Sequence, residues 1–301
     1  MRLILLFLDG VGIGKDDASV NPFFKAHLPV LYSTLGNRLP SRKNKRIETT
    51  EAGCTPLNAT LGVAGMPQSG TGQVALFTGK NGAKLAGRHF GPYPPTTLRS
   101  TLEEYNLFTQ VRRKGKSISF LNAYPHQFFD YVKSGTRRLT VTTLSCFYAG
   151  IPLHGITELR KNEALSADIT RKRWPELGYP DLLLLPEHEA GMHLWRLAQL
   201  HDVTVFEYWL PDHAGHSQNM QFAVEVLETF DRFLGGILSD FDFRNSLLII
   251  VSDHGNIEDL SIKSHTRNQV PCIVIGHEHK RFTATVRNLT HITPTILKFL
   301  T

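Results

Sequence analysis

Cysteine is scarce in this sequence. Only 3 of the 301 residues are cysteines, and they stand far apart, at Cys54, Cys146 and Cys272. An odd number of widely spaced cysteines with no Cys-x-x-Cys pair argues against a disulfide framework and against a thiolate metal site. It is typical of proteins in a reducing compartment, so we expect a cytoplasmic protein.

Long apolar runs are missing as well. None approaches the roughly 20 residues that a membrane-spanning helix needs, so we expect no membrane partner. The run Leu3–Leu8 ends at Asp9 and is followed by Gly-Val-Gly-Ile-Gly instead of a small-residue cleavage site. We therefore expect a buried first strand and no signal peptide. With 41% hydrophobic residues, the chain has enough apolar surface for one large core.

Apolar runs of strand length alternate with stretches of helical periodicity. The pattern predicts strands at Leu3–Leu8, Ser117–Leu121, Val203–Tyr208, Leu247–Val251 and Val270–Ile275. It predicts helices at Pro22–Leu35, Leu98–Arg113, Glu189–Leu200, Met220–Leu238 and Thr293–Leu300. This alternation indicates an α/β fold with a mostly parallel central sheet. Functional groups in such folds gather beyond the carboxyl ends of the strands.

The middle of the chain breaks this pattern. Between about residues 125 and 185 the alternation is lost and basic pairs appear. We interpret this segment as a small inserted cap on a core that is made of residues 1–124 and 186–301.

Aspartate and histidine gather in three short segments of the second half. Ten of the 14 histidines follow residue 185, and the three segments are Asp212-His213-Ala214-Gly215-His216, Ser252-Asp253-His254-Gly255-Asn256 and Ser264-His265-Thr266. Capping is the commoner role of one such segment alone. Together with Asp9, all at strand ends, they predict a metal site. Imidazole and carboxylate ligands suit Zn or Mn.

A glycine-rich loop with two hydroxyl residues follows Gly65. It contains Ser69-Gly70-Thr71-Gly72 and leads into a short predicted helix. A hydroxyl at a helix start can become a nucleophile when a nearby cation lowers its pKa. Ser69 and Thr71 both qualify by chemistry. The loop is not a P-loop, because no Gly-Lys-Ser/Thr follows at the required spacing.

These motifs, in this order, resemble those of the alkaline phosphatase superfamily. More narrowly, Asp9-Gly10, the Gly-Thr-Gly loop, Asp212 to His216, Asp253 to Asn256 and His265-Thr266 are similar to the branch with cofactor-independent phosphoglycerate mutase and phosphopentomutase. The resemblance covers roughly residues 1–80 and 203–276. It implies an alkaline-phosphatase-like three-layer sandwich.

The resemblance also implies two divalent metal ions, Mn or Zn. One would be held by Asp212, His216 and His265, and the other by Asp9, Asp253, His254 and the nucleophile. Counting back from Gly79, which ends the nucleophile's helix, selects Thr71 as that nucleophile and metal ligand. The expected chemistry is two-metal phosphoryl transfer through a phosphothreonine on a small phosphorylated substrate.

The outcome of this transfer is open between hydrolysis and a phosphomutase reaction. A mutase must keep its phosphorylated intermediate away from water, and the predicted cap is small. We therefore expect hydrolysis of a small phosphate ester, with the phosphomutase as the alternative. A sulfatase is disfavoured because Cys54-Thr55-Pro56-Leu57-Asn58 lacks the arginine of the sulfatase segment.

Arginine is the usual partner of phosphate oxygens. Arg267 stands two residues after His265, and Arg137 and Arg138 lie in the insertion, where they could reach over the site. Asn122 follows a predicted strand. We take all four as candidate substrate-binding residues, although a solvated surface is the simpler interpretation of Arg137 and Arg138 and a capping role that of Asn122.

Two rival functions need no catalysis. The basic run Arg42–Arg46 could contact nucleic acid, but it lacks interleaved aromatics and acidic residues follow it closely, so we expect no nucleic-acid partner. A silent regulatory domain is the second rival, yet every ligand position that the resemblance implies is filled. The sequence does not fix the oligomeric state.

Overall fold

A seven-stranded sheet forms the centre of the molecule. The computed structural model describes residues 1–135 and 138–300. The strands are ordered β2-β3-β9-β8-β1-β7-β4 across the sheet. Their bounds are β1 (Arg2–Leu8), β2 (Ile47–Glu48), β3 (Ala52–Leu57), β4 (Ile118–Phe120), β7 (Val203–Tyr208), β8 (Ser246–Val251) and β9 (Val270–Gly276).

The direction of the strands decides which loops meet. Strand β1 pairs in parallel with β7 and β8, and β4 pairs in parallel with β7. Strand β9 runs antiparallel to both β8 and β3. The chain therefore enters β9 at the same edge at which β1, β3, β7 and β8 end. The loop before β9 and the loops after those strands share this edge.

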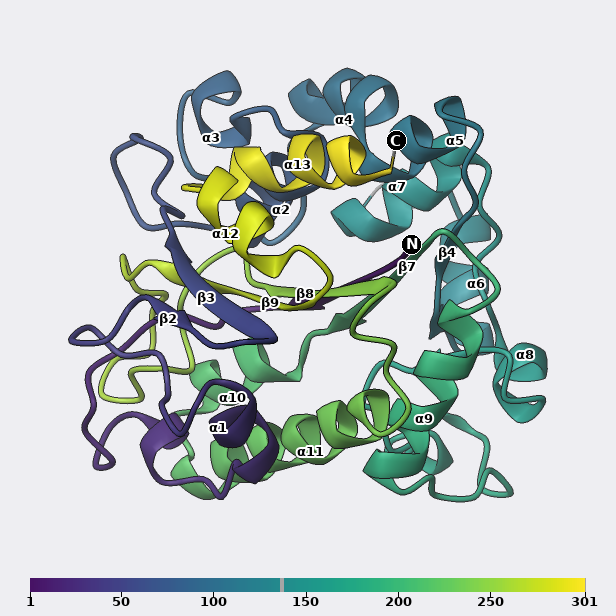
Figure 1. Ribbon diagram of the computed structural model, residues 1–301. Coiled ribbons are helices and arrows are strands. Elements are labelled where there is room, and N and C mark those ends of the chain that lie inside the picture. The colour runs from purple at the N-terminus through teal and green to yellow at the C-terminus, as the bar shows by residue number, and fades with distance from the viewer. Residues whose placement is uncertain (136–137, 301) are drawn as a thin grey trace.

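Helices cover both faces of the sheet (Figure 1). One face carries α1 (Pro29–Thr34), α9 (Glu187–Ala198), α10 (Leu210–Ser217) and α11 (Met220–Leu238). The other carries α2 (Ser69–Thr78), α3 (Gly82–Leu85), α4 (Arg99–Tyr105), α5 (Leu107–Arg113), α12 (His279–Thr285) and α13 (Ile292–Phe299). Short 3-10 turns lie at η1 (Pro22–Phe24), η2 (Thr96–Leu98) and η4 (Leu289–His291). The predicted three-layer α/β sandwich is confirmed.

The apolar run of β1 is continuous because both of its faces are buried. Leu3, Leu5 and Phe7 join the core cluster under one helical layer, whereas the alternate residues Ile4 and Leu6 join the cluster under the other layer. This is the pattern expected of a central parallel strand.

The predicted insertion is only partly separate from the core. Its strands β5 (Asn122–Ala123) and β6 (Leu165–Ser166) form a small parallel sheet, accompanied by α6 (His126–Lys133), α8 (Ile156–Arg160) and η3 (Pro175–Leu177). However, α7 (Val141–Ala149), which also lies inside residues 125–185, packs against α2, α4 and α5 of the core. A small apolar cluster around Leu159 and Trp174 supports the rest of the segment.

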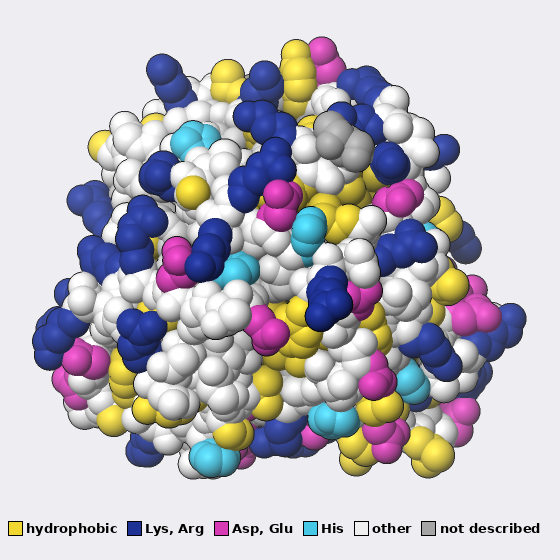
Figure 2. Space-filling view, in the orientation of Figure 1, with side chains coloured by type: hydrophobic (Ala, Val, Ile, Leu, Met, Phe, Trp, Pro, Cys, Tyr) yellow, Lys and Arg dark blue, Asp and Glu magenta, His cyan; other side chains and the backbone are white. Residues whose placement is uncertain are grey.

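Basic side chains are spread over the face in Figure 2 and mixed with acidic ones. In the basic run Arg42–Arg46, Arg42 donates to Asn268 over 2.8 Å and Lys43 pairs with Asp16 over 3.0 Å. These contacts tie the run to the protein surface. Among the described residues, no helix combines the length and the apolar character needed to cross a membrane.

Gly10 occupies a place that no other residue fits. Its φ is +71°, and a Cβ there would stand 2.6 Å from an Asp212 carboxylate oxygen. Gly62 has a similar φ of +70° but has open space around the corresponding position. Both glycines therefore need a positive φ, but only Gly10 lies so close to a neighbouring side chain that a Cβ atom would clash.

We predict that Gly10→Ala destabilises the protein more than Gly62→Ala. Both substitutions impose a left-handed alanine, which costs about 1–3 kcal/mol, but only Gly10→Ala also displaces Asp212. Urea unfolding of both variants in a metal-free buffer measures the difference. Equal losses of stability in the two variants would contradict the account.

Candidate metal centre

The carboxyl edge of the sheet gathers the predicted ligands from separate parts of the chain. Asp9 directly follows β1, and Asp253 comes two residues after β8. Asp212 and His216 lie one turn apart on α10, which follows β7, so they share a helix face. His265 lies in the loop before β9, which the antiparallel direction of β9 brings to the same edge.

Asp212, His216 and His265 form one compact group of three ligand atoms. The Nε2 atoms of His216 and His265 are 3.2 Å apart, and each lies within 3.6 Å of an Asp212 carboxylate oxygen. Each ring places Nδ1 near a backbone carbonyl, 3.0 Å from that of Lys263 for His216 and 2.8 Å from that of Pro67 for His265. Nδ1 therefore donates and Nε2 keeps its lone pair, as in histidines that bind metal.

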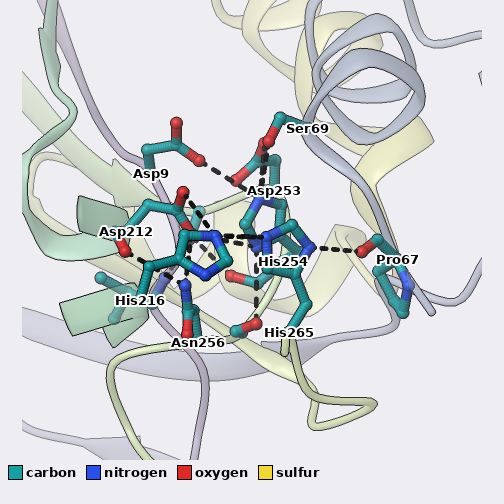
Figure 3. Close-up of polar contacts among 12 residues, drawn as sticks. Asp9, Pro67, Ser69, Asp212, His216, Asp253, His254, Asn256 and His265 are labelled. Carbon is teal, nitrogen blue, oxygen red and sulfur yellow. Dashed lines mark hydrogen bonds and ion pairs between the residues drawn. The ribbon is translucent and has the colours of Figure 1, made fainter. Parts of the chain in front are cut away.

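Asp9, Asp212 and His254 form the second compact group (Figure 3). His254 Nε2 lies 3.3 Å from an Asp9 oxygen and 3.7 Å from an Asp253 oxygen. Asp212 lies between the two groups, because its Oδ1 is also 4.0 Å from His254 Nδ1.

The Ser69 hydroxyl, and not that of Thr71, points into this centre. Ser69 Oγ lies 2.9 Å from His254 Nε2. Thr71 is fully buried and its hydroxyl bonds the backbone of Phe90, accepting from its N–H over 3.1 Å. The structure therefore brings together every predicted ligand except Thr71, and places Ser69 where Thr71 was predicted.

Negative charge is crowded here. Burial, reinforced by the Asp253 carboxylate, raises the pKa of Asp9 to about 8. Burial opposes a charge on His254, but the Asp253 and Asp9 carboxylates outweigh it and raise the pKa of His254 to about 10. By contrast, burial lowers the pKa of His265 to about 4, so this ring is neutral and ready to donate a lone pair.

The donor set fits divalent cations. Asp253 is fully buried, yet neither of its carboxylate oxygens meets the geometry of a hydrogen bond with any described residue. Its one ion-pair contact among the described residues is with His254 over 3.7 Å, so this buried carboxylate is poorly compensated and a bound cation would offset its charge. The lone pairs of His216 and His265 also approach each other closely, and a bound cation would relieve their repulsion. Carboxylate and imidazole together are ligands for Zn or Mn.

Glu258 joins two of the ligand loops, the one after β1 and the one between β8 and β9. One of its carboxylate oxygens accepts from the backbone N–H groups of Gly12 and Asn256, over 2.9 and 2.7 Å. The other accepts from the side chains of Thr266 and Asn268. It is almost completely buried. Glu258 therefore holds the two ends of the loop between β8 and β9, which carry Asp253 and His265, against each other and against the loop after β1.

A cavity of about 560 Å³ opens beside Asp9 and Ser69, a size suited to a small molecule. Asn122 lines it as predicted, and its amide exchanges hydrogen bonds of 2.7 and 2.8 Å with the backbone of Glu207. Arg267 and Arg138 are exposed and do not line the cavity. Arg137 lies outside the described residues.

Sequence reasoning also missed Glu207 and Arg173 in the cavity wall. Burial raises the pKa of Glu207 to about 7, and the Thr142 hydroxyl donates to its carboxylate over 2.6 Å. An acidic residue inside the apolar strand Val203–Tyr208 was a signal that could have revealed it. Nothing in the sequence around Arg173 distinguishes it from its basic neighbours.

Comparisons with known proteins agree with this geometry. Residues 192–301 match the family model of the Metalloenzyme superfamily. The chain is 32% identical over 215 residues to 2,3-bisphosphoglycerate-independent phosphoglycerate mutase of Thiobacillus denitrificans, covering 69% of this chain and 37% of that protein. It is 36% identical over 110 residues to the mutase of the same name from Antithamnion sp., covering 34% of this chain and 22% of that protein.

Solved structures share the fold. Alkaline phosphatase from the Antarctic bacterium TAB5 superposes with a TM-score of 0.57 at 12% identity, covering 99% of this chain and 97% of that one. Phosphoglycerate mutase of Leishmania mexicana gives 0.51 at 12% identity, covering 99% and 95%. These structures confirm the predicted alkaline-phosphatase-like fold, and the sequence matches confirm the predicted resemblance to cofactor-independent phosphoglycerate mutase. The chain spans less than two fifths of the length of the curated relatives described above.

We predict that stabilisation by Mn²⁺ increases between pH 6 and pH 8.5. The fold raises the pKa of Asp9 from 3.8 to about 8 and that of His254 from 6.5 to about 10. The metal-free folded protein therefore binds more protons at these groups than the unfolded chain does, so its free energy of unfolding falls as pH rises. A cation must displace the same protons, so it binds better at higher pH. The Tm with Mn²⁺, minus the Tm in EDTA, measures the effect. A difference that stays constant or shrinks would contradict it.

We predict that Glu258→Gln weakens Mn²⁺ binding by about 10–100-fold, the usual effect of losing a residue that orients metal ligands. In the wild type, four donors share the Glu258 carboxylate. In the variant, the side-chain amide places an N–H group where one carboxylate oxygen accepted hydrogen bonds, so those bonds are lost. Titration calorimetry measures the affinity, with exposed Glu103→Gln on α4 as the matched control. Affinity equal to that of the control would exclude the bracing role.

Proposed function

We propose that the chain catalyses metal-dependent phosphoryl transfer from a small phosphate ester, with Ser69 as the nucleophile. The observation that carries the proposal is the position of the Ser69 hydroxyl, 2.9 Å from the Nε2 atom of His254, which itself lies 3.3 Å from Asp9 and 3.7 Å from Asp253. A hydroxyl in such a ligand cluster is activated when a cation lowers its pKa. The names of the relatives and the metalloenzyme family model support this reaction class.

Two ions are supported by the two ligand groups that share Asp212. Asp212, His216 and His265 would hold one, and Asp9, Asp253, His254 and Ser69 the other. When bound, such a pair offsets the charge repulsion between a nucleophilic oxygen and a phosphate. The ligand chemistry suits Mn or Zn equally.

The chain's own residues then perform the transfer. Ser69 Oγ loses its proton and attacks phosphorus, and the bond from phosphorus to the alcohol oxygen breaks. The leaving alcohol oxygen takes up the proton that Ser69 released, and a phosphoserine remains. The first turn of α2 fixes Ser69 at the mouth of the cavity, so the ester must approach from the cavity side.

Hydrolysis completes the reaction when water attacks the phosphoserine and releases phosphate. The cavity opens to solvent along its side, which favours water as the acceptor. A phosphomutase is the second candidate, because the curated relatives carry that name. Phosphorus-31 NMR separates the two outcomes, since hydrolysis yields inorganic phosphate and a mutase yields an isomeric ester.

We predict that Ser69→Ala abolishes turnover of a phosphate monoester by about 10³-fold or more, while Thr71→Val keeps kcat within about 3-fold. The valine substitution removes a hydroxyl that bonds only backbone, so it lowers stability by about 1–3 kcal/mol without touching the centre. Steady-state kinetics in Mn²⁺ measure both variants. Loss of turnover in Thr71→Val, with Ser69→Ala active, would reverse the assignment.

A further inference from the structure

Aromatic rings form much of the cavity wall beyond the metal centre. Tyr93, Tyr124, Trp174 and Trp209 all line it. The Trp174 indole N–H donates to Ser166 Oγ over 2.7 Å, so the polar edge of this ring is already satisfied inside the protein. Tyr124 is likewise occupied at its hydroxyl, which lies 3.2 Å from that of Thr143. These rings therefore offer mainly carbon surface to a ligand.

Positive charge is sparse in the same wall. Among the described residues that line the cavity, Arg173 is the only Lys, Arg or His. Its guanidinium stands 4.9 Å over the ring of Trp209. The acids Asp9, Asp168, Glu207 and Asp212 also line the cavity. A ligand with a second anionic group, away from the phosphate, would thus meet one cation among several carboxylates.

The carboxylate of Asp168 is already engaged by its own loop. It accepts from the Ser166 hydroxyl and from the backbone N–H groups of Arg171 and Arg173, both over 2.9 Å. These bonds fix the loop that presents Trp174 and Arg173. The aromatic part of the wall is therefore rigid, as expected of a preformed ligand site.

We propose that the substrate is the phosphate ester of an uncharged alcohol that carries a planar ring. This inference rests on the proposed function for the phosphate end and adds the identity of the leaving group. The phosphate lies at Asp9 and Ser69, and the ring packs against the aromatic wall that includes Trp209 and Tyr124. Rings pack favourably on one another. The scarcity of cations disfavours phosphoglycerate-like esters, whose alcohol carries a carboxylate.

Binding without turnover tests the ring preference directly. Ser69→Ala protein loaded with Mn²⁺ is titrated with phenylphosphonate and with methylphosphonate, which share the anionic head but differ in the ring. We expect phenylphosphonate to bind about 10-fold tighter or better, in the range of aromatic stacking contributions. Equal affinities would overturn the proposal.

Variants in the wall locate the preference. Trp209→Leu and Tyr124→Leu should each lower kcat/KM for phenyl phosphate by about 5–100-fold, chiefly through KM, and lower it several-fold less for glycerol 2-phosphate. The aliphatic ester reports on folding and on the metal centre in the same protein. Equal losses on both esters in both variants, or a higher wild-type kcat/KM for 3-phosphoglycerate than for phenyl phosphate, would refute ring recognition.

The two proposals fail in different ways. If wild-type protein with Mn²⁺ turns over no ester but phenylphosphonate still binds preferentially, phosphoryl transfer is wrong and ring recognition stands. If Ser69-dependent turnover is found without preference for the ring, the reaction stands and the substrate class is wrong.

Discussion

Crowding of negative charge is the constraint on which the rest of this structure depends. Asp9, Asp212 and Asp253 approach one buried imidazole, that of His254, and Asp253 has no hydrogen-bond partner among the described residues. Such an arrangement is costly unless the fold holds it firmly and bound protons or a cation neutralise it. The close approach of Gly10 to Asp212 and the bracing by Glu258 supply the first condition. The carboxylate and imidazole side chains can bind the cation that neutralises the charge.

Topology explains why these residues meet although they are far apart in sequence. Parallel strands end at one edge, and the antiparallel β9 begins there. Ligands placed just after β1 and β8, on α10 and just before β9 therefore converge without long loops. The residues between β4 and α9 complete the other side of the cavity. They contribute Tyr124 and Trp174 to the aromatic wall, and the core contributes Tyr93 and Trp209.

Strand positions and the clustering of the candidate ligands were predictable because both leave periodic or spaced signals. The alternation of apolar runs predicts β1, β7, β8 and β9 closely, and the Asp and His segments follow from strand ends. Strand β3 was not predicted, because Gly53 and Pro56 interrupt its apolar pattern, although all its residues are buried. Ser69 and Thr71 stand two residues apart, which is about 200° around a helix, so their hydroxyls point to opposite sides. Sequence spacing alone does not show which of these two hydroxyls faces the metal centre. It also does not show that Arg173 lines the cavity while Arg267 does not.

The central claim is that this cluster of acids and imidazoles holds two divalent ions. It is tested most directly by counting the metal in the protein. Protein dialysed with Mn²⁺ or Zn²⁺ and then freed of loosely bound metal is assayed by mass spectrometry of the elements, alongside Asp212→Asn, which alters the residue shared by both groups. We predict two ions per chain in the wild type and fewer than two in the variant. A wild-type chain that retains none, or a variant that retains two, would contradict the account.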